Sequence, residues 1–191
     1  MAITRKLRAF AWVAAVLGLF LLASGAIAKN PEKEKRKLRE QSQDVLTALY
    51  EAVPGARAAV TDAAGYATFR NFGLKLGVAG GGRGKGLAVA RGGAETFMDF
   101  LEVQAGVGVG IKKYDLVFVF ETDEAYRRFI DSGWEYGGQA TVAAKRGDQG
   151  HAFEGAVSVS PGVWLYQLTS SGLTAELTLK SSKYYKDKDL N

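Results

Sequence analysis

The chain has 191 residues, of which 47% are hydrophobic and 24% charged, which fits a single folded domain and excludes wholesale disorder. It has no cysteine and one histidine, which excludes disulfides, thiolate metal sites, a cysteine nucleophile, a lipid-modified N-terminal cysteine and histidine-based metal clusters. The formal net charge is +5, but without the first 28 residues 22 basic residues face 20 acidic ones, an excess of +2 that argues against nucleic-acid binding.

The first 28 residues have the three-part layout of a secretory signal peptide. An apolar run extends from Ala9 to Ala23, and the small residues Ala26 and Ala28 precede an expected cleavage between Ala28 and Lys29. The basic residues before the apolar run are Arg5, Lys6 and Arg8. The alternative is an uncleaved inner-membrane anchor, because the uncharged stretch is just long enough to cross a hydrocarbon core of about 30 Å. Both interpretations export the rest of the chain, to the periplasm or to an outer-membrane-associated location.

Residues 29–64 are expected to form an N-terminal helical segment. Asn30 can cap a helix with Pro31 at its first position, and the helix is predicted to continue to Ala52 before Pro54 and Gly55 end it. Its apolar residues recur at helical spacing, at Leu38, Val45, Leu46, Leu49 and Val53. A second short helix is predicted over residues 56–64.

From Tyr66 onward the hydrophobic period becomes two, which predicts strands. Alternation occurs at 74–79, 87–90, 106–111, 134–145 and 173–180, and the apolar run Leu116–Phe120 predicts a strand buried on both faces. One helix interrupts the strands, with Thr122 as its cap, Gly133 at its end and acidic residues in its first turn. Residues 170–172 are expected to form a hairpin turn.

The predicted fold class is therefore α+β. We expect a mainly antiparallel, strongly bent or barrel-like sheet of about eight strands, with N-terminal helices and one inserted helix. Residues 65–191 would be the strand-rich body of a single domain that extends over about 32–189.

The glycine-rich stretch Gly80–Gly86 suggests a phosphate-binding loop but does not fit one, because Gly86 follows Lys85 where a P-loop has serine or threonine. We expect a glycine-rich turn between strands. The alternative is a loop whose backbone N–H groups, together with Arg83 and Lys85, bind a phosphate-bearing head group.

No set of residues predicts catalysis or metal binding. His151 has no serine or aspartate partner pattern, and Glu121, Asp123 and Glu124 are better explained as charges at the start of a helix. We therefore expect no enzyme activity, no cofactor and no metal. The glycines at 106, 108 and 110 share one strand face and indicate close packing of a neighbouring element.

Several motifs, in their order, resemble the SYLF domain family. They are Ala63–Phe69 (AAGYATF), Leu76–Gly82 with Gly84–Gly86, Val107–Gly110, the Leu116–Phe120 strand, the helix that contains Phe129, Trp134–Gly137 and Leu173–Glu176. The resemblance extends from about Val45 to Tyr185. Eukaryotic members bind phosphoinositides and act in actin-patch and endocytic adaptors, while bacterial members are mostly exported. The resemblance thus implies binding of anionic phospholipid or of a membrane surface, without catalysis.

The residues nominated for lipid binding are chosen on charge alone. They form two basic clusters, one in the first half of the N-terminal helix and one in the glycine-rich stretch. The nominated residues are Lys33, Lys35, Arg36, Lys37, Arg39, Arg83 and Lys85. For the helix cluster a purely solvated face is the other interpretation, because Glu32, Glu34 and Glu40 are interleaved with the cations.

A second function class is a structural or protein-interaction module of the periplasm or outer membrane. It would use aromatic surface at Trp164, Tyr166, Tyr184 and Tyr185. An actin-binding-like role is implied by the family resemblance alone.

Overall fold

The computed structural model describes residues 30–136, 153–169, 172–173 and 181–191. The expected signal peptide, most of the strand predicted over 134–145, His151 and most of the strand predicted over 173–180 lie outside these ranges. Residues Pro31–Asn191 form one compact unit. No helix in the described part is both long and apolar enough to span a membrane.

The helices lie where the sequence predicts them. Helix α2 spans Pro31–Ala52 and α3 spans Ala56–Asp62. Helix α4 spans Asp123–Ser132, and the Thr122 hydroxyl accepts a hydrogen bond from the backbone N–H of Ala125. This bond satisfies one of the N–H groups that have no partner within the helix, which explains why the helix begins there.

The strands form one curled antiparallel sheet, so the predicted α+β class and bent sheet are confirmed. In the described part the sheet has seven strands, with the order β3-β7-β2-β5-β4, β1 on β2 and β6 on β5. Their bounds are β1 Gly65–Ala90, β2 Glu95–Phe120, β3 Trp134–Tyr136, β4 Val157–Ser160, β5 Val163–Thr169, β6 Gly172–Leu173 and β7 Ser181–Lys186. Strands β5 and β6 pair antiparallel, with Thr169 opposite Gly172, and residues 170–171 of the predicted turn lie outside the described residues.

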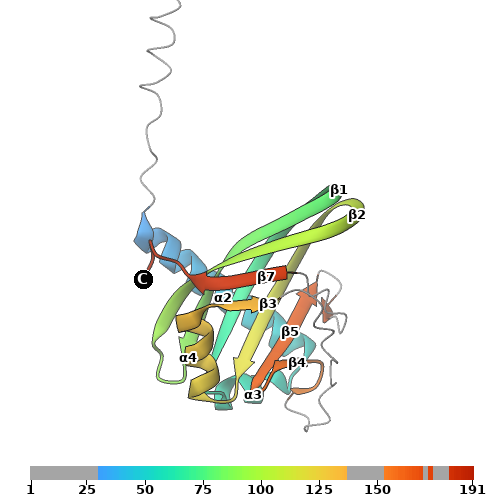
Figure 1. Ribbon diagram of the computed structural model, residues 1–191. Coiled ribbons are helices and arrows are strands. Elements are labelled where there is room, and N and C mark those ends of the chain that lie inside the picture. The colour runs from blue at the N-terminus through green and yellow to red at the C-terminus, as the bar shows by residue number, and fades with distance from the viewer. Residues whose placement is uncertain (1–29, 137–152, 170–171, 174–180) are drawn as a thin grey trace, which may run out of the picture. The chain divides into compact units, whose positions relative to one another are not determined.

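Two expectations about the strands are wrong. The segments predicted as separate strands at 74–79 and 87–90 both belong to β1, and those at 106–111 and 116–120 both belong to β2. The stretch Gly80–Gly86 is neither a turn nor a phosphate loop, because it lies inside β1 and pairs residue by residue with β2. Figure 1 shows β1 and β2 running out together to a tip and back again. The pairing of β1 with β2 shifts register between Gly77 and Ala79, which makes the ribbon irregular at this point.

The glycines of this stretch allow β1 to fold back over its own first half. A Cβ at Gly84 would overlap the Arg70 carbonyl oxygen, and a Cβ at Gly86 would overlap the Thr68 carbonyl oxygen and the Phe69 ring. Alternate residues of a strand point to the same side, so glycines at 82, 84 and 86 leave the inner side of β1 free of side chains at these three positions.

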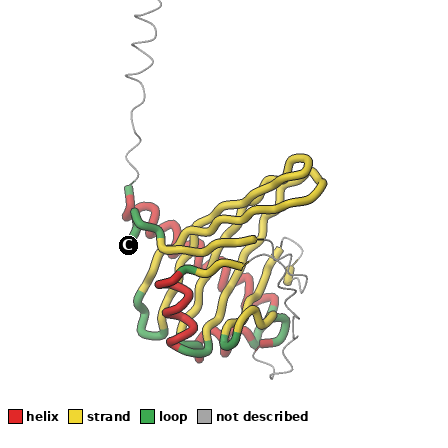
Figure 2. Tube along the Cα trace, in the orientation of Figure 1, coloured by secondary structure: helices red, strands yellow, loops and turns green. Residues whose placement is uncertain are grey.

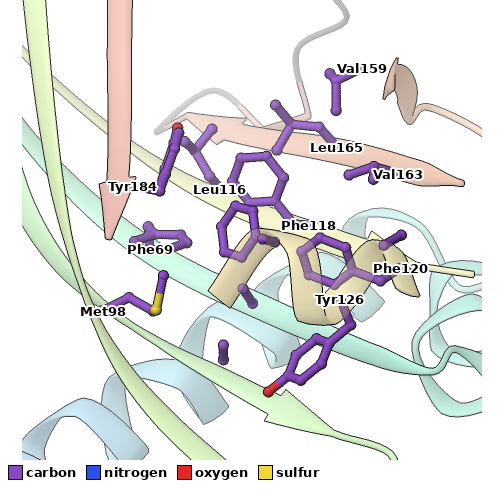
Figure 3. Packing of buried hydrophobic residues seen from close by; sticks show 14 of the residues in the cluster. Phe69, Met98, Leu116, Phe118, Phe120, Tyr126, Val159, Val163, Leu165 and Tyr184 are labelled. Carbon is purple, nitrogen blue, oxygen red and sulfur yellow. The ribbon is translucent and has the colours of Figure 1, made fainter. Parts of the chain in front are cut away.

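The main core lies between the two halves of the folded β1–β2 ribbon and α4 (Figure 3). It is rich in aromatic side chains, whose rings pack edge-on or stacked, with Phe69 and Tyr184 4.9 Å apart between centroids. A second cluster packs α2 and α3 on the opposite face of β2 and β5. Leu116–Phe120 is therefore buried on both faces, as predicted. A third, smaller cluster joins Leu38, Leu87, Phe97 and Leu190.

Candidate functional site

The candidate surface lies on the outer side of the returning half of the ribbon. Arg83 of β1 stands opposite Leu101 of β2, and Leu101 stands opposite Lys183 of β7, so the three residues form one row across three strands. Val103 belongs to the next row towards the tip. We call Arg83, Leu101, Val103 and Lys183 the outer face; all four are exposed.

Leu101 and Val103 are the exposed large hydrophobic residues of the described part of the chain, with exposed fractions of 45% and 58%. Their inward-facing neighbour Glu102 is buried, which is the alternation expected of a strand with one face on the core. Sequence analysis missed both residues. The alternation of the strand could have identified them. Successive side chains point to opposite faces, so Leu101 and Val103 point outward if Phe100 and Glu102 point inward.

Beyond this face the ribbon continues as a projecting arm (Figure 2). We define the β-arm as residues 72–81 of β1 and 103–113 of β2. Its sequence contains Lys75, Lys112 and Lys113 and neither aspartate nor glutamate. The arm is therefore a locally cationic element of a chain whose charges otherwise nearly balance.

A buried polar cluster closes the root of the arm. The carboxylate of Glu102 accepts a hydrogen bond from Asn71 Nδ2 at 3.3 Å and another from the Tyr114 hydroxyl. Gly82 leaves the space that this cluster fills, because a Cβ there would lie 2.8 Å from Asn71 Oδ1. Buried polar groups are stabilised only when they have partners, so these bonds fix how the two halves of the ribbon meet.

The seven nominated cations do not form one site. Lys85 forms ion pairs with Asp187, whose side chain is only 3% exposed, and with Asp99 at 3.6 Å. Arg39 pairs with Glu95 at 2.8 Å, and the hydrogen bond to that carboxylate raises the pKa of Arg39 above its ordinary value. Lys85 and Arg39 are thus held by contacts within the fold.

The other five nominated cations differ in their exposure and contacts. Lys35 pairs with Glu32 at 3.3 Å and lies 5.6 Å from the centre of the Phe97 ring, and Lys33 is exposed near the start of α2. Arg36, Lys37 and Arg83 are exposed and form no ion pair with another described residue. Figure 1 places the start of α2 at the upper left of this unit and the tip of the arm at its upper right.

The expectation that four aromatic residues form an exposed surface for protein interaction is wrong for three of them. Trp164, Tyr166 and Tyr184 are buried, with exposed fractions of 7%, 0% and 1%. Burial raises the pKa of Tyr166 to about 12 and raises that of Tyr184 well above its ordinary value. Tyr185 alone of the four is half-buried.

The described part of the chain therefore defines a compact α+β module with an exposed face of mixed basic and apolar character. No group of three histidine, cysteine, aspartate or glutamate side chains in this part could hold a metal ion. A family model described as Ysc84, a Las17-binding protein and actin regulator, matches residues 101–191. The resemblance to the SYLF (Ysc84) family is thus confirmed, with residues 101–191 as the matched part.

The chain is also similar to Beta cell expansion factor A of Aeromonas veronii. The two sequences are 29% identical over 165 residues, a match that covers 85% of this chain and 60% of that protein. The chain therefore spans about 60% of the length of this relative.

Proposed function

We propose that this protein is a non-catalytic SYLF module of the cell envelope, exported by its N-terminal segment, that binds anionic phospholipid surfaces. The observation that carries the proposal is that three of the seven nominated cations, Arg36, Lys37 and Arg83, are exposed and form no ion pair with another described residue. Each basic residue close to an anionic membrane contributes about 1 kcal/mol to binding. Cations that already have acidic partners, such as Lys85, contribute less because the local charge is neutralised.

The proposal is tested with the protein purified from the compartment to which the cell exports it. Mass spectrometry would establish its N-terminus, which we expect at Lys29. We expect co-sedimentation with vesicles of phosphatidylglycerol and phosphatidylcholine that weakens as salt rises, and little with phosphatidylcholine alone. Equal binding to both vesicle types, or none at low salt, would overturn the proposal.

A protein-interaction role is the second candidate, favoured by the name of the matching family model, which describes a Las17-binding protein. Of the four aromatic residues expected to carry it, Tyr185 keeps an accessible side chain. Crosslinking in intact cells followed by identification of the captured chains distinguishes the two candidates. A single recurrent protein partner, with no binding to vesicles, would favour this second role.

A further inference from the structure

The β-arm and the outer face at its root adjoin each other on the same two strands. Leu101 and Val103 expose large apolar side chains to solvent, which has an unfavourable free energy unless a partner covers them. Arg83 lies directly opposite Leu101 in the strand register. A surface that pairs exposed apolar groups with an adjacent cation fits a partner that is apolar inside and anionic at its surface.

We propose that the β-arm, with the outer face at its root, is the element that enters the head-group layer of an anionic bilayer. Leu101 and Val103 would insert below the phosphates, while Arg83 would contact them. The inference rests on the proposed function, and it adds the contacting element and an apolar contribution to binding. The apolar contacts of such an element contribute to affinity in a way that resists salt, whereas the contribution of its cations weakens as salt rises.

The charges on and around this surface favour a lipid surface over a second copy of the chain. Asp99, the acidic residue in the row below Leu101, is already paired with Lys85, and the arm has no carboxylate of its own. Glu135 of β3 stands opposite Lys183 at the border of the face. A symmetric contact between two copies would bring together two arms of the same positive net charge, which is repulsive. An array of phosphates offers the opposite charge at every point of contact.

The absence of cysteine from the chain gives a direct test. In the Val103→Cys variant the introduced thiol is unique and can carry an environment-sensitive nitrobenzoxadiazole fluorophore. Ser132→Cys, exposed on α4, is the matched control. We expect that vesicles containing phosphatidylglycerol shift the emission of the probe at 103 to shorter wavelength and shield it from a water-soluble quencher, while the probe at 132 stays in water. A probe at 103 that stays in water while the protein co-sediments with vesicles would overturn this inference and leave the proposed function standing.

A second measurement needs no label. The double variant Leu101→Ser/Val103→Ser should bind the same vesicles about tenfold more weakly, because it loses two partly exposed apolar side chains. The loss should persist at high salt, whereas the loss caused by Arg83→Glu should fade as salt screens the charge. Unchanged affinity in the double variant would overturn the inference. So would a blue shift of the probe at 103 that depends on protein concentration without vesicles, because the partner would then be a second copy.

Discussion

At the scale of single residues, Arg83 and Lys85 show how position decides what a cation does. They are two residues apart on β1, so they point to the same side of the strand, and sequence analysis nominated both for lipid binding. Of the two, Lys85 alone forms ion pairs with described carboxylates, and one of these, that of Asp187, is buried. That partner is 102 residues away in the sequence, a separation at which no local pattern reveals an ion pair.

We therefore predict different effects for the two glutamine variants. Lys85→Gln leaves the buried Asp187 carboxylate without its cation and should lower the free energy of unfolding by roughly 1–3 kcal/mol, with little effect on vesicle affinity. Arg83→Gln should change stability by no more than about 0.5 kcal/mol and should weaken vesicle binding. Urea denaturation and co-sedimentation of both variants check this. A Lys85→Gln protein of normal stability and reduced affinity would show that Lys85 is a binding residue after all.

The buried tyrosines predict how stability depends on alkaline pH. Burial raises the pKa of Tyr166 to about 12, whereas an unfolded tyrosine has a pKa of about 10. The folded state thus favours the protonated phenol, so this contribution to stability is complete below about pH 10 and is lost as the pH rises towards about 12. We expect Tyr166→Phe to lose stability less steeply over this range in urea titrations. Parallel curves for the two proteins would contradict the assignment.

At the scale of elements, the sequence predicts the helices better than the strands. Helices α2 and α4 carry their own signals, a proline or a capping threonine at the start and apolar residues at helical spacing. The course of β1 depends on glycines whose role is set by a remote part of the same strand. A local pattern predicts a turn at these glycines because glycine is common in turns. The folded strand shows that the glycines make room for the first half of β1. Likewise, the sequence of β5 alone does not show that Trp164 and Tyr166 are buried. Helices α2 and α3, from a distant part of the sequence, cover this face of the strand.

The fold-back gives a sharp prediction. Gly86→Ala places a Cβ against the Thr68 carbonyl oxygen and the Phe69 ring, so we expect a loss of roughly 1–3 kcal/mol in the free energy of unfolding. Gly92→Ala is the matched control, because a Cβ there meets no atom within 4 Å, and it should be close to neutral. Thermal and urea denaturation of the two variants give the comparison. Equal stability would mean that β1 does not cross itself at this point.

The polar cluster at the root of the arm is predicted to hold the two halves of the ribbon together. Glu102→Ala removes the acceptor for the buried Asn71 Nδ2, which costs about 1–3 kcal/mol, and for the partly buried Tyr114 hydroxyl, which costs less. Glu102→Gln keeps an acceptor oxygen and should lose less. Amide hydrogen exchange should accelerate in residues 72–81 and 103–113 of the alanine variant before it does so in α4. Uniform acceleration across the unit would contradict an anchoring role.

At the scale of the whole molecule, the distribution of charge matters more than its total. The net charge beyond residue 28 is small, yet the sequence of the arm includes three lysines and no acidic residue, and the start of α2 carries Arg36 and Lys37 without ion pairs to other described residues. In Figure 1 the start of α2 lies at the upper left of the unit and the tip of the arm at its upper right, and Leu38 of α2 packs on Leu87 and Phe97 of the β1–β2 ribbon. Variants in each region separate their contributions to binding.

We expect the arm end to be the side that contacts the membrane, because among the described side chains the exposed apolar residues Leu101 and Val103 adjoin a cation there. The single reversal Arg83→Glu should therefore weaken binding to phosphatidylglycerol vesicles more than the double reversal Arg36→Glu/Lys37→Glu does, although the double variant changes twice the charge. Arg127→Glu, on the exposed surface of α4, is the control for the change in net charge and should have the smallest effect. Co-sedimentation at low salt ranks the three variants by their affinity for the vesicles. If the loss of affinity instead follows the change in net charge regardless of its position, binding is a diffuse electrostatic attraction. If Arg36→Glu/Lys37→Glu loses the most affinity, α2 contacts the membrane and the arm binds another partner.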